Sequence, residues 1–525
     1  MRRFARLGAL AATSALAVSG VVTATAPSAQ ALLTPNPQAG TAAASWLAGE
    51  LQNGVLSTSG FPDYGESIDA GFSLQAIGNH AADVTDVADA VQAGGTSYLE
   101  YSYVDGADTF AGQSANATAK AMAFFQSLSA PRTTVGSINL QNRLESLTTA
   151  SGRIEDVSTK NSVPDGQNYA NTLGQAFAAR ALSAAGSTEA PAARTFLLGQ
   201  QCASGYFRLS FTAADPTCAT GDAANIDATA IAAAQLAAIS GPPTAVTDAI
   251  TRARTWLASV QNCDGSFGSG DDGENANTTG LAATALGSSV ASQEAARWLN
   301  RHQAKSPAVA AVADAGAIAL NDADYAAGSK SAIATAARGR WQRATAQAAT
   351  GLASFSTQAA PLIHLSSVSG YRKAGSKVSF RVTGADEGTV VCLGTSKAFT
   401  TATGAILTGT LPAGTGSRTL TARDGYGNTA GSVVKVLGTK TLKVAKSKAK
   451  VKRNRYVTVT VSGLQPGERA SIKFRNVVKA SGTASSTGTF AGSFKVGAKK
   501  GKATIAGYGQ FGDIRKGATK IKVVR

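Results

Sequence analysis

The sequence predicts a mainly α-helical body of repeated helical hairpins, followed by two small β-sandwich domains. Two observations predict this fold class. An alanine-rich segment recurs about every fifty residues through the first two thirds of the chain. From about residue 360, the spacing of apolar residues changes from a helical period of 3.6 to a strand period of 2.

The first 31 residues are predicted to be a secretory signal peptide. Arg2, Arg3 and Arg6 precede a short apolar run of small residues, and a small-x-small site ends at Ala31. The run is too short and too rich in alanine for a membrane span, so we expect export and cleavage after Ala31. The expected location is therefore extracellular, with the cell wall as a candidate site of association and without a transmembrane segment.

Residues 32–355 contain the helical repeat. Each alanine-rich copy opens with Asn, Asp, Ser or Thr, the pattern of an N-capped and buried helix. Alanine lets such helices pack closely with little loss of side-chain entropy. The equivalent positions of six copies are Asp69, Ala117, Thr172, Asp227, Thr278 and Asp314.

A second pattern with larger residues lies between the alanine-rich helices. Phe196, Trp256 and Trp298 each precede a glutamine by five positions. Each repeat is therefore predicted as an amphipathic outer helix, a glycine turn and a small-residue inner helix. In two copies the pattern continues as Gln-x3-Gly-x-Phe, at Gln201, Gly205 and Phe207 and at Gln261, Gly265 and Phe267.

This motif at helix ends resembles the prenyltransferase and squalene oxidase repeat of the terpenoid-cyclase-like α/α toroid superfamily. The resemblance covers roughly residues 40–340 and is strongest over 165–290. It implies an α/α toroid of six helical hairpins, with twelve helices in two concentric rings. Phe207 and Phe267 stand where tryptophan usually ends the motif in the cyclases. The resemblance is stronger evidence for the fold than for any catalytic activity.

The catalytic signatures of that superfamily are missing from the sequence. It contains neither the Asp-x-Asp-Asp acid of squalene-cyclase-like enzymes nor the Asp-Asp-x-x-Asp magnesium motif. Asp227 begins an inner helix where prenyltransferase β subunits hold zinc, but the next repeat offers no Cys or His. We therefore predict no catalytic residues and no cofactor, and we favour a non-enzymatic protein over an isoprenoid-processing terpene cyclase or prenyltransferase.

A cobalamin carrier is a further alternative. The helices "NIDATAIAAAQL" and "ANTTGLAATAL" are similar to the inner helices of intrinsic-factor-type carriers, which hold a corrinoid between a toroid and a β domain. Toroid packing by itself also demands alanine-rich inner helices. A small hydrophobic ligand other than a corrinoid could also occupy the toroid.

An acidic, glycine-rich loop joins two of the repeats. Asp271, Asp272 and Glu274 could hold calcium through their carboxylates, although their spacing differs from that of an EF-hand. The simpler interpretation is a solvated turn, with Gly265 at positive φ and Asn277 as the helix cap. We therefore predict a connection between helices and no metal site.

The four cysteines suit an exported protein. Cys202 and Cys218 bracket one loop, and we predict a disulfide between them. The competing pair is Cys202 with Cys263, because these residues occupy nearly the same place in successive repeats. The pairing of Cys263 and Cys392 is left open.

The isolated histidines and tyrosines are less informative. His80 and His302 lie on or beside helical patterns and are expected at the surface. Tyr98, Tyr101 and Tyr103 alternate with polar residues, which fits the end of a barrel, a loop or a short strand.

Residues 360–438 and 441–525 are predicted as two β-sandwiches of an immunoglobulin-like kind. Alternating runs such as "SKVSFRVTG" and "GTFAGSFKVG" predict half-buried strands. Pro466 and Gly467 separate two such runs, which predicts a hairpin at this turn.

The positive charge is concentrated in the last domain. Residues 441–525 carry 20 Lys and Arg against only Glu468 and Asp513, a net of +18, whereas the formal net charge of the whole chain is +17. Nucleic acid is the usual partner of such charge, but export disfavours it. We expect this domain to bind anionic cell-wall polymers or acidic lipid headgroups, with simple solubility as the alternative. The predicted function is ligand or surface binding outside the cell.

Overall fold

The computed structural model describes most of the chain after the predicted signal peptide, and residues 1–31 lie outside the described residues. Described are residues 38–58, 60–268, 273–305, 312–328, 332–357 and 361–525. Among them, no helix is long and apolar enough to cross a membrane.

The helical body consists of alternating outer and inner helices. The described outer helices are α1 (Gln38–Glu50), α3 (Ala81–Gly94), α6 (Leu140–Ser146), α8 (Ala190–Gly199), α10 (Thr244–Val260) and α12 (Val290–His302). The described inner helices are α2 (Tyr64–Ile77), α5 (Ala115–Ser127), α7 (Thr172–Ala185), α9 (Ile226–Ala237), α11 (Ala276–Leu286) and α14 (Thr335–Leu352).

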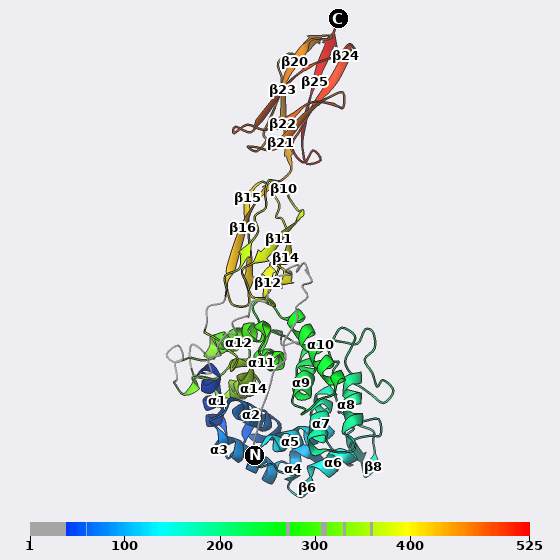
Figure 1. The fold of residues 1–525 in the computed structure, drawn as a ribbon, viewed down its shortest axis with the longest axis vertical. Coiled ribbons are helices and arrows are strands. Elements are labelled where there is room, and N and C mark those ends of the chain that lie inside the picture. The colour runs from blue at the N-terminus through cyan, green and yellow to red at the C-terminus, as the bar shows by residue number, and fades with distance from the viewer. Residues whose placement is uncertain (1–37, 59, 269–272, 306–311, 329–331, 358–360) are drawn as a thin grey trace, which may run out of the picture. The chain divides into compact units, whose positions relative to one another are not determined.

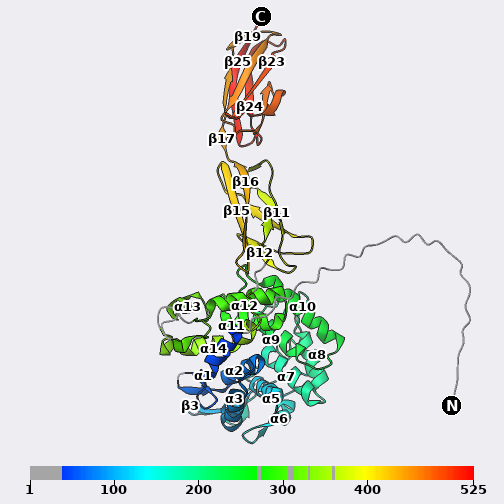
Figure 2. The ribbon, with the colours of Figure 1, turned by 60° about the vertical axis from the view of Figure 1, so that its left-hand side comes forward.

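The inner helices close into a ring. Helix α2 contacts α5, and contacts continue in order through α7, α9, α11 and α14, which in turn contacts α2. Each outer helix contacts the inner helix that precedes it around the ring, and α1 contacts α14. The two ends of the helical body, blue and yellow-green in Figures 1 and 2, therefore lie side by side.

Side-chain caps and buried alanines explain why these segments form the inner ring. The N-caps Asp63, Ser114, Asn171, Asn225 and Asn275 each accept a hydrogen bond from a backbone N–H in the first turn. Asn275 thus caps α11, and the prediction that Asn277 is the cap was wrong. Fully buried alanines such as Ala119, Ala178 and Ala232 let the helices approach closely.

The sixth alanine-rich copy was misplaced by the sequence pattern. Val312–Asp314 form only a short 3₁₀ turn, and the last inner helix is α14. Asp314 instead accepts a hydrogen bond from the Ile333 backbone N–H at 2.9 Å and lies 3.2 Å from the Arg338 guanidinium. A short run of alanines imitates an inner helix in sequence, but the packing surface for α11 and α2 comes from the 18-residue α14.

Short helices, hairpins and one small sheet lie in the connections between the helices of the body. They include α4 (Thr96–Leu99), α13 (Asp322–Gly328) and the hairpins β1 (Leu56–Thr58) with β2 (Phe61–Asp63) and β5 (Thr134–Val135) with β6 (Ile138–Asn139). A four-stranded sheet has the order β3 (Glu100–Asp105), β4 (Asp108–Gln113), β7 (Val157–Lys160) and β8 (Val163–Pro164). Tyr101 and Tyr103 lie on β3, so the short-strand alternative is the correct one for them.

His302 is buried, and the prediction that it lies at the surface was wrong. Its ring stacks on Trp298 with centroids 3.7 Å apart, and its Nε2 lies 2.7 Å from Asp322 Oδ1. The i, i+4 spacing of Trp298 and His302 places both rings on one face of α12, where α13 covers the histidine through Tyr325.

The first β domain contains two sheets around one apolar core. One sheet has the order β10 (Tyr371–Lys373), β16 (Thr429–Leu437), β15 (Gly416–Asp424), β12 (Val390–Leu393) and β13 (Ser396–Phe399). The other has the order β14 (Ala405–Thr410), β11 (Lys377–Thr383) and β9 (His364–Leu365).

The last domain repeats this plan with a second core. One sheet has the order β17 (Lys440–Thr441), β25 (Arg515–Val524), β24 (Gly501–Tyr508), β21 (Arg469–Phe474) and β22 (Val477–Thr483), and β19 (Lys450–Lys452) also pairs with β25. The other has the order β18 (Lys443–Lys446), β20 (Tyr456–Ser462) and β23 (Thr489–Lys495).

Pro466 and Gly467 do not form the predicted hairpin. Strand β20 pairs with β18 and β23, whereas β21 pairs with β22 and β24, so the turn carries the chain from one sheet to the other. The alternating pattern identifies strands but does not determine which strand each one pairs with.

Two disulfides join the four cysteines. Cys202 is bonded to Cys218, the pair predicted from the loop, and Cys263 is bonded to Cys392 in the first β domain. Lys397 supports the second connection, because its Nζ donates to the carbonyl oxygens of Ser259 at 2.7 Å and Gln261 at 2.6 Å.

Candidate functional site

The Gln-x3-Gly-x-Phe motif builds the frame of the ring. Gln261 Nε2 donates to the carbonyl oxygens of Gly265 at 2.9 Å and of Ala291, in the next outer helix, at 2.8 Å. Gly265 has a φ of +91°, and a Cβ there would lie 2.3 Å from the Glu294 carbonyl oxygen. Only glycine allows this close approach between the turn and α12.

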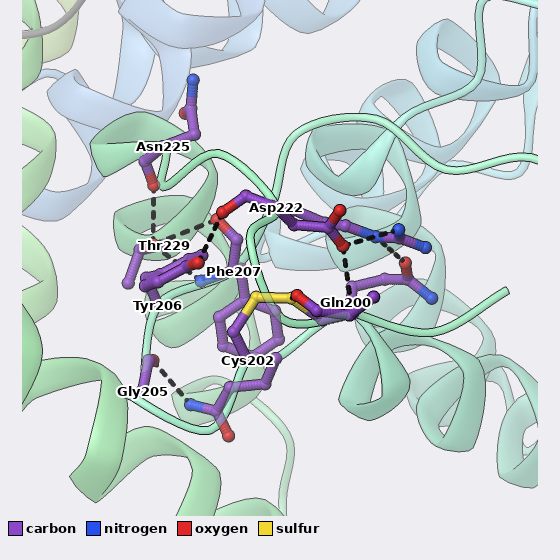
Figure 3. The surroundings of a disulfide bond; sticks show 12 residues. Gln200, Cys202, Gly205, Tyr206, Phe207, Asp222, Asn225 and Thr229 are labelled. Atoms are coloured by element: carbon purple, nitrogen blue, oxygen red, sulfur yellow. Dashed lines mark hydrogen bonds and ion pairs between the residues drawn. A yellow bond between two sulfur atoms is a disulfide. The ribbon is translucent and has the colours of Figure 1, made fainter. Parts of the chain in front are cut away.

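The phenylalanine of the motif ties each turn to an inner helix. Phe207 N–H donates to Thr229 Oγ1 at 2.9 Å, and Phe267 N–H donates to Thr279 Oγ1 at the same distance. Figure 3 shows Thr229 directed at Phe207, beside the disulfide of Cys202. Gln201 repeats the contacts of Gln261, donating to Gly205 at 2.9 Å and Ala249 at 2.8 Å. The motif residues are therefore structural and do not line the cavity described below.

The structure contains further copies of this turn that sequence reasoning missed. Gln303 donates to Gly316 O at 3.1 Å and Ala39 O at 2.8 Å, and Ile318 N–H donates to Thr345 Oγ1 at 2.9 Å. The insertion between this glutamine and its glycine hides the copy. A Gly-x-apolar signal before each inner helix would have found it, together with Gly152-x-Ile154 and Gly54-x-Leu56.

A cavity of about 510 Å³ lies within the ring of inner helices. All six inner helices named above contribute to its wall. The apolar part of the wall includes Phe72, Leu173, Phe177, Ile231 and Leu281. The polar part consists of Asp69, Ser73, Gln75, Tyr98, Asn116, Lys120, Asn171, Gln235, Thr284, Gln347 and Thr350.

One ion pair stands in the wall of this cavity. Lys120 Nζ lies 2.6 Å from Asp69 Oδ1 and donates to the Gly65 carbonyl oxygen at 2.9 Å. Burial lowers the pKa of Lys120, but Asp69 and Tyr98 outweigh it, so this pKa lies above its usual value. The same burial raises the pKa of Tyr98. Gln347 of α14 also contacts the pair, because its Nε2 donates to Asp69 Oδ2 at 3.3 Å.

A buried carboxyl group adjoins this pair, one helical turn before Asp69. Glu66 is 6% exposed, and its Oε1 has no hydrogen-bond partner among the residues that the structure describes. Burial raises the pKa of Glu66 from 4.5 to about 7, because the opposing effect of Arg343, 3.9 Å away, is smaller and Asp63 and Asp69 add to the increase. Sequence reasoning missed Glu66 and Lys120, since neither belongs to a recognisable motif.

The acidic loop contributes little to a site in the described residues. Asp271 and Asp272 lie outside the described residues, while Glu274 forms an isolated bridge with Gly268. Burial is the main cause that raises the pKa of Glu274. Within the described ranges, no three His, Cys, Asp or Glu side chains are grouped as ligands for a metal ion.

The last domain offers a second, cationic site. A groove of about 470 Å³ is lined by Arg475, Lys499, Lys500, Lys502 and Lys520, together with Asn476, Ala503 and Thr504. The two acidic residues of the domain lie elsewhere. Glu468 forms a fully buried pair with Arg515 at 2.7 Å, and Asp513 pairs with Lys373 of the preceding domain.

No protein-family model matches the chain, and no curated protein matches it. Among solved structures, the type II terpene cyclase MstE from Scytonema is 14% identical, with 60% of this chain and 97% of that chain covered and a TM-score of 0.40. A protein from Actinoplanes is 17% identical, covering 60% and 98%, with a TM-score of 0.39. Fibronectin(III)-like modules of Clostridium thermocellum CbhA are 18% identical, covering 31% and 94%, with a TM-score of 0.20. At these identities and scores, the likeness carries no activity over to this chain.

Proposed function

We propose that this chain is an exported, non-enzymatic binding protein. Its ring cavity holds a small, mainly apolar ligand, and residues 441–525 attach it to anionic polymers or acidic lipid headgroups of the cell envelope. The observation that carries the proposal is the cavity of about 510 Å³ lined by the inner helices. This volume lies within the range of small-molecule sites, which are mostly apolar with a few placed polar groups.

The wall of the cavity indicates the kind of ligand. Phe72 and Phe177 stack with centroids 6.0 Å apart and offer aromatic surface to an apolar body. Asn116, Gln235 and Gln347 offer hydrogen bonds to a polar end. Because Lys120 and Asp69 neutralise each other, we expect a ligand of low net charge.

Native mass spectrometry of the full chain tests the proposal. We expect a retained small molecule, or stoichiometric binding of the apolar fluorophore anilinonaphthalene sulfonate. Ala234→Leu on α9 places a larger side chain in the cavity and should abolish binding. The control Ala237→Leu, on the same helix but exposed, should bind like the unmodified protein.

A bare mass together with no dye binding would contradict a ligand-binding ring. A corrinoid as the retained mass would select the cobalamin-carrier alternative within the same proposal.

An isoprenoid-processing enzyme is the second candidate function. The observation that favours it is Glu66, a buried acid with a raised pKa beside a partly apolar cavity. Glu66 itself does not line the cavity, which is why we rank this function second. Incubation with geranylgeranyl diphosphate should leave the substrate unchanged if the protein is non-enzymatic. A cyclised product that is lost in both Asp69→Asn and Glu66→Gln would reverse the ranking.

A further inference from the structure

The outward face of the larger sheet in the last domain carries a row of lysines. Strand register places Lys450 of β19 opposite Lys522 of β25, and Lys522 opposite Lys502 of β24. All three side chains are exposed. Neighbouring strands lie about 4.8 Å apart, so three positive charges stand side by side across three strands.

A second line of cations lies next to this row. Lys520 precedes Lys522 by two residues and is also exposed, so both point to the same side of the sheet about 6.8 Å apart along β25. Arg475 comes from the turn after β21, where its backbone N–H donates to Thr504 of β24 at 3.2 Å. Its guanidinium donates to the Lys499 carbonyl oxygen at 2.6 Å, which holds it beside the lysines of the groove.

This arrangement is unfavourable for the isolated domain. Like charges directly opposite each other on neighbouring strands destabilise a sheet. No acidic side chain of the domain compensates them, because Glu468 is buried against Arg515 and Asp513 pairs with Lys373. A soluble surface normally intersperses both signs of charge. An anion from outside the chain would therefore relieve the repulsion between these lysines.

Resting on the proposed attachment to the envelope, we propose that this lysine-row face binds a linear phosphodiester polymer. We define the lysine-row face as Lys450, Lys502, Lys520 and Lys522 with the adjoining groove cations Arg475, Lys499 and Lys500. A chain of regularly spaced phosphates can place successive charges on both lines of cations at once. Each phosphate contact releases counterions, so the affinity should depend steeply on salt.

An acidic membrane is the competing partner, and the face fits it less well. Thr504 and Ala518 stand among the lysines, and neither presents a large apolar side chain for insertion between lipids. Exposed Val477 and Val478 lie on β22, at the far edge of the same sheet. Two valines bury little area in a bilayer compared with the number of cations on the face.

Two triple variants of the full chain test the proposal. Lys502→Gln, Lys520→Gln and Lys522→Gln together remove the centre of the face. The matched control is Lys443→Gln, Arg455→Gln and Lys495→Gln, which removes the same charge from exposed positions on and beside the other sheet. Circular dichroism verifies that both variants fold. Binding is measured to poly(glycerol phosphate), to polyglutamate and to equimolar phosphatidylglycerol–phosphatidylcholine vesicles over a range of salt concentrations.

We expect the first variant to raise the Kd for poly(glycerol phosphate) about tenfold, with the control changing it less than about threefold. The slope of log Kd against log salt should fall by about 2 in the first variant. Equal weakening in both variants would overturn the assignment of the face, and preferential binding of polyglutamate or vesicles would overturn the assignment of the polymer. In both cases the attachment function would stand, whereas binding to none of the three probes would overturn attachment itself.

Discussion

Lys120 and Asp69 join two neighbouring inner helices across the wall of the cavity, with Nζ and Oδ1 2.6 Å apart. The side chains are 17% and 21% exposed, so water screens the pair only in part. Lys120 comes from α5 and Asp69 from α2, which also contact each other through Phe72 and Phe124. The ion pair thus links two neighbours of the inner ring directly.

Breaking this pair should destabilise the helical body. We expect Lys120→Met to lower the free energy of unfolding by about 2 kcal/mol, because it leaves Asp69 partly buried without its cation. The measurement is urea unfolding followed by tryptophan fluorescence, since Trp46, Trp256, Trp298 and Trp341 all lie in the helical body. Adding Asp69→Asn should recover at least half of the loss. No recovery in the double variant would mean that the two residues act independently.

The stability of the helical body should fall as the pH rises from 4.5 to 7. The folded state raises the pKa of Glu66 from 4.5 to about 7, so in this window the unfolded chain ionises while the folded protein keeps the proton. The contribution of the protonated Glu66 is fully present below pH 4.5 and is lost as the pH rises through 7, a change of about 3 kcal/mol. Glu66→Gln removes this titration. The difference in unfolding free energy between the two proteins, measured at pH 4.5 and 7.5, should change by that amount. A constant difference would show that Glu66 titrates normally.

The repeat turn should depend on its threonine. Thr279→Val keeps the shape of the side chain but leaves the buried N–H of Phe267 without its acceptor, while the Phe267 carbonyl oxygen keeps the Asn275 N–H as a donor. We expect a loss of about 2 kcal/mol in the same urea experiment. Thr284→Val on the same helix is the control, because its hydroxyl donates to the Gly280 carbonyl oxygen within α11 itself. Equal losses in the two variants would argue against the structural role of the turn.

The disulfide between Cys202 and Cys218 should stabilise the connection between α8 and α9. Replacing both cysteines with alanine opens a loop with a sequence separation of 16, which should cost about 3 kcal/mol. Peptide mapping without reduction should find Cys202 linked to Cys218 and Cys263 linked to Cys392. A Cys202–Cys263 peptide would instead support the pairing of successive repeats.

Much of the helical body could be predicted because its signals are local. An Asn or Asp cap followed by alanines specifies a buried helix within a few residues, as at Asn225 and Asn275. The same local pattern predicted a helix at Asp314, but the residues that follow Asp314 form a turn. Gly205 and Gly265 were found because a fixed spacing joins them to Gln201 and Gln261, whereas the insertion before Gly316 hid an equivalent turn.

The candidate sites depend on contacts between distant residues. Lys120 and Asp69 are 51 positions apart, and each alone is an ordinary helical residue. The lysine-row face requires the pairing of β19, β25 and β24, which alternation of apolar residues cannot specify.

The sequence by itself determined the hairpin repeat, the change to β structure and the location of the positive charge, because caps, periodicity and composition act over short stretches of chain. Only the tertiary structure decided that the inner helices close around a cavity, that Glu66 is held away from water and that lysines from three strands stand in one row. Ring closure, burial and strand register each arise from packing between segments that are far apart in the chain.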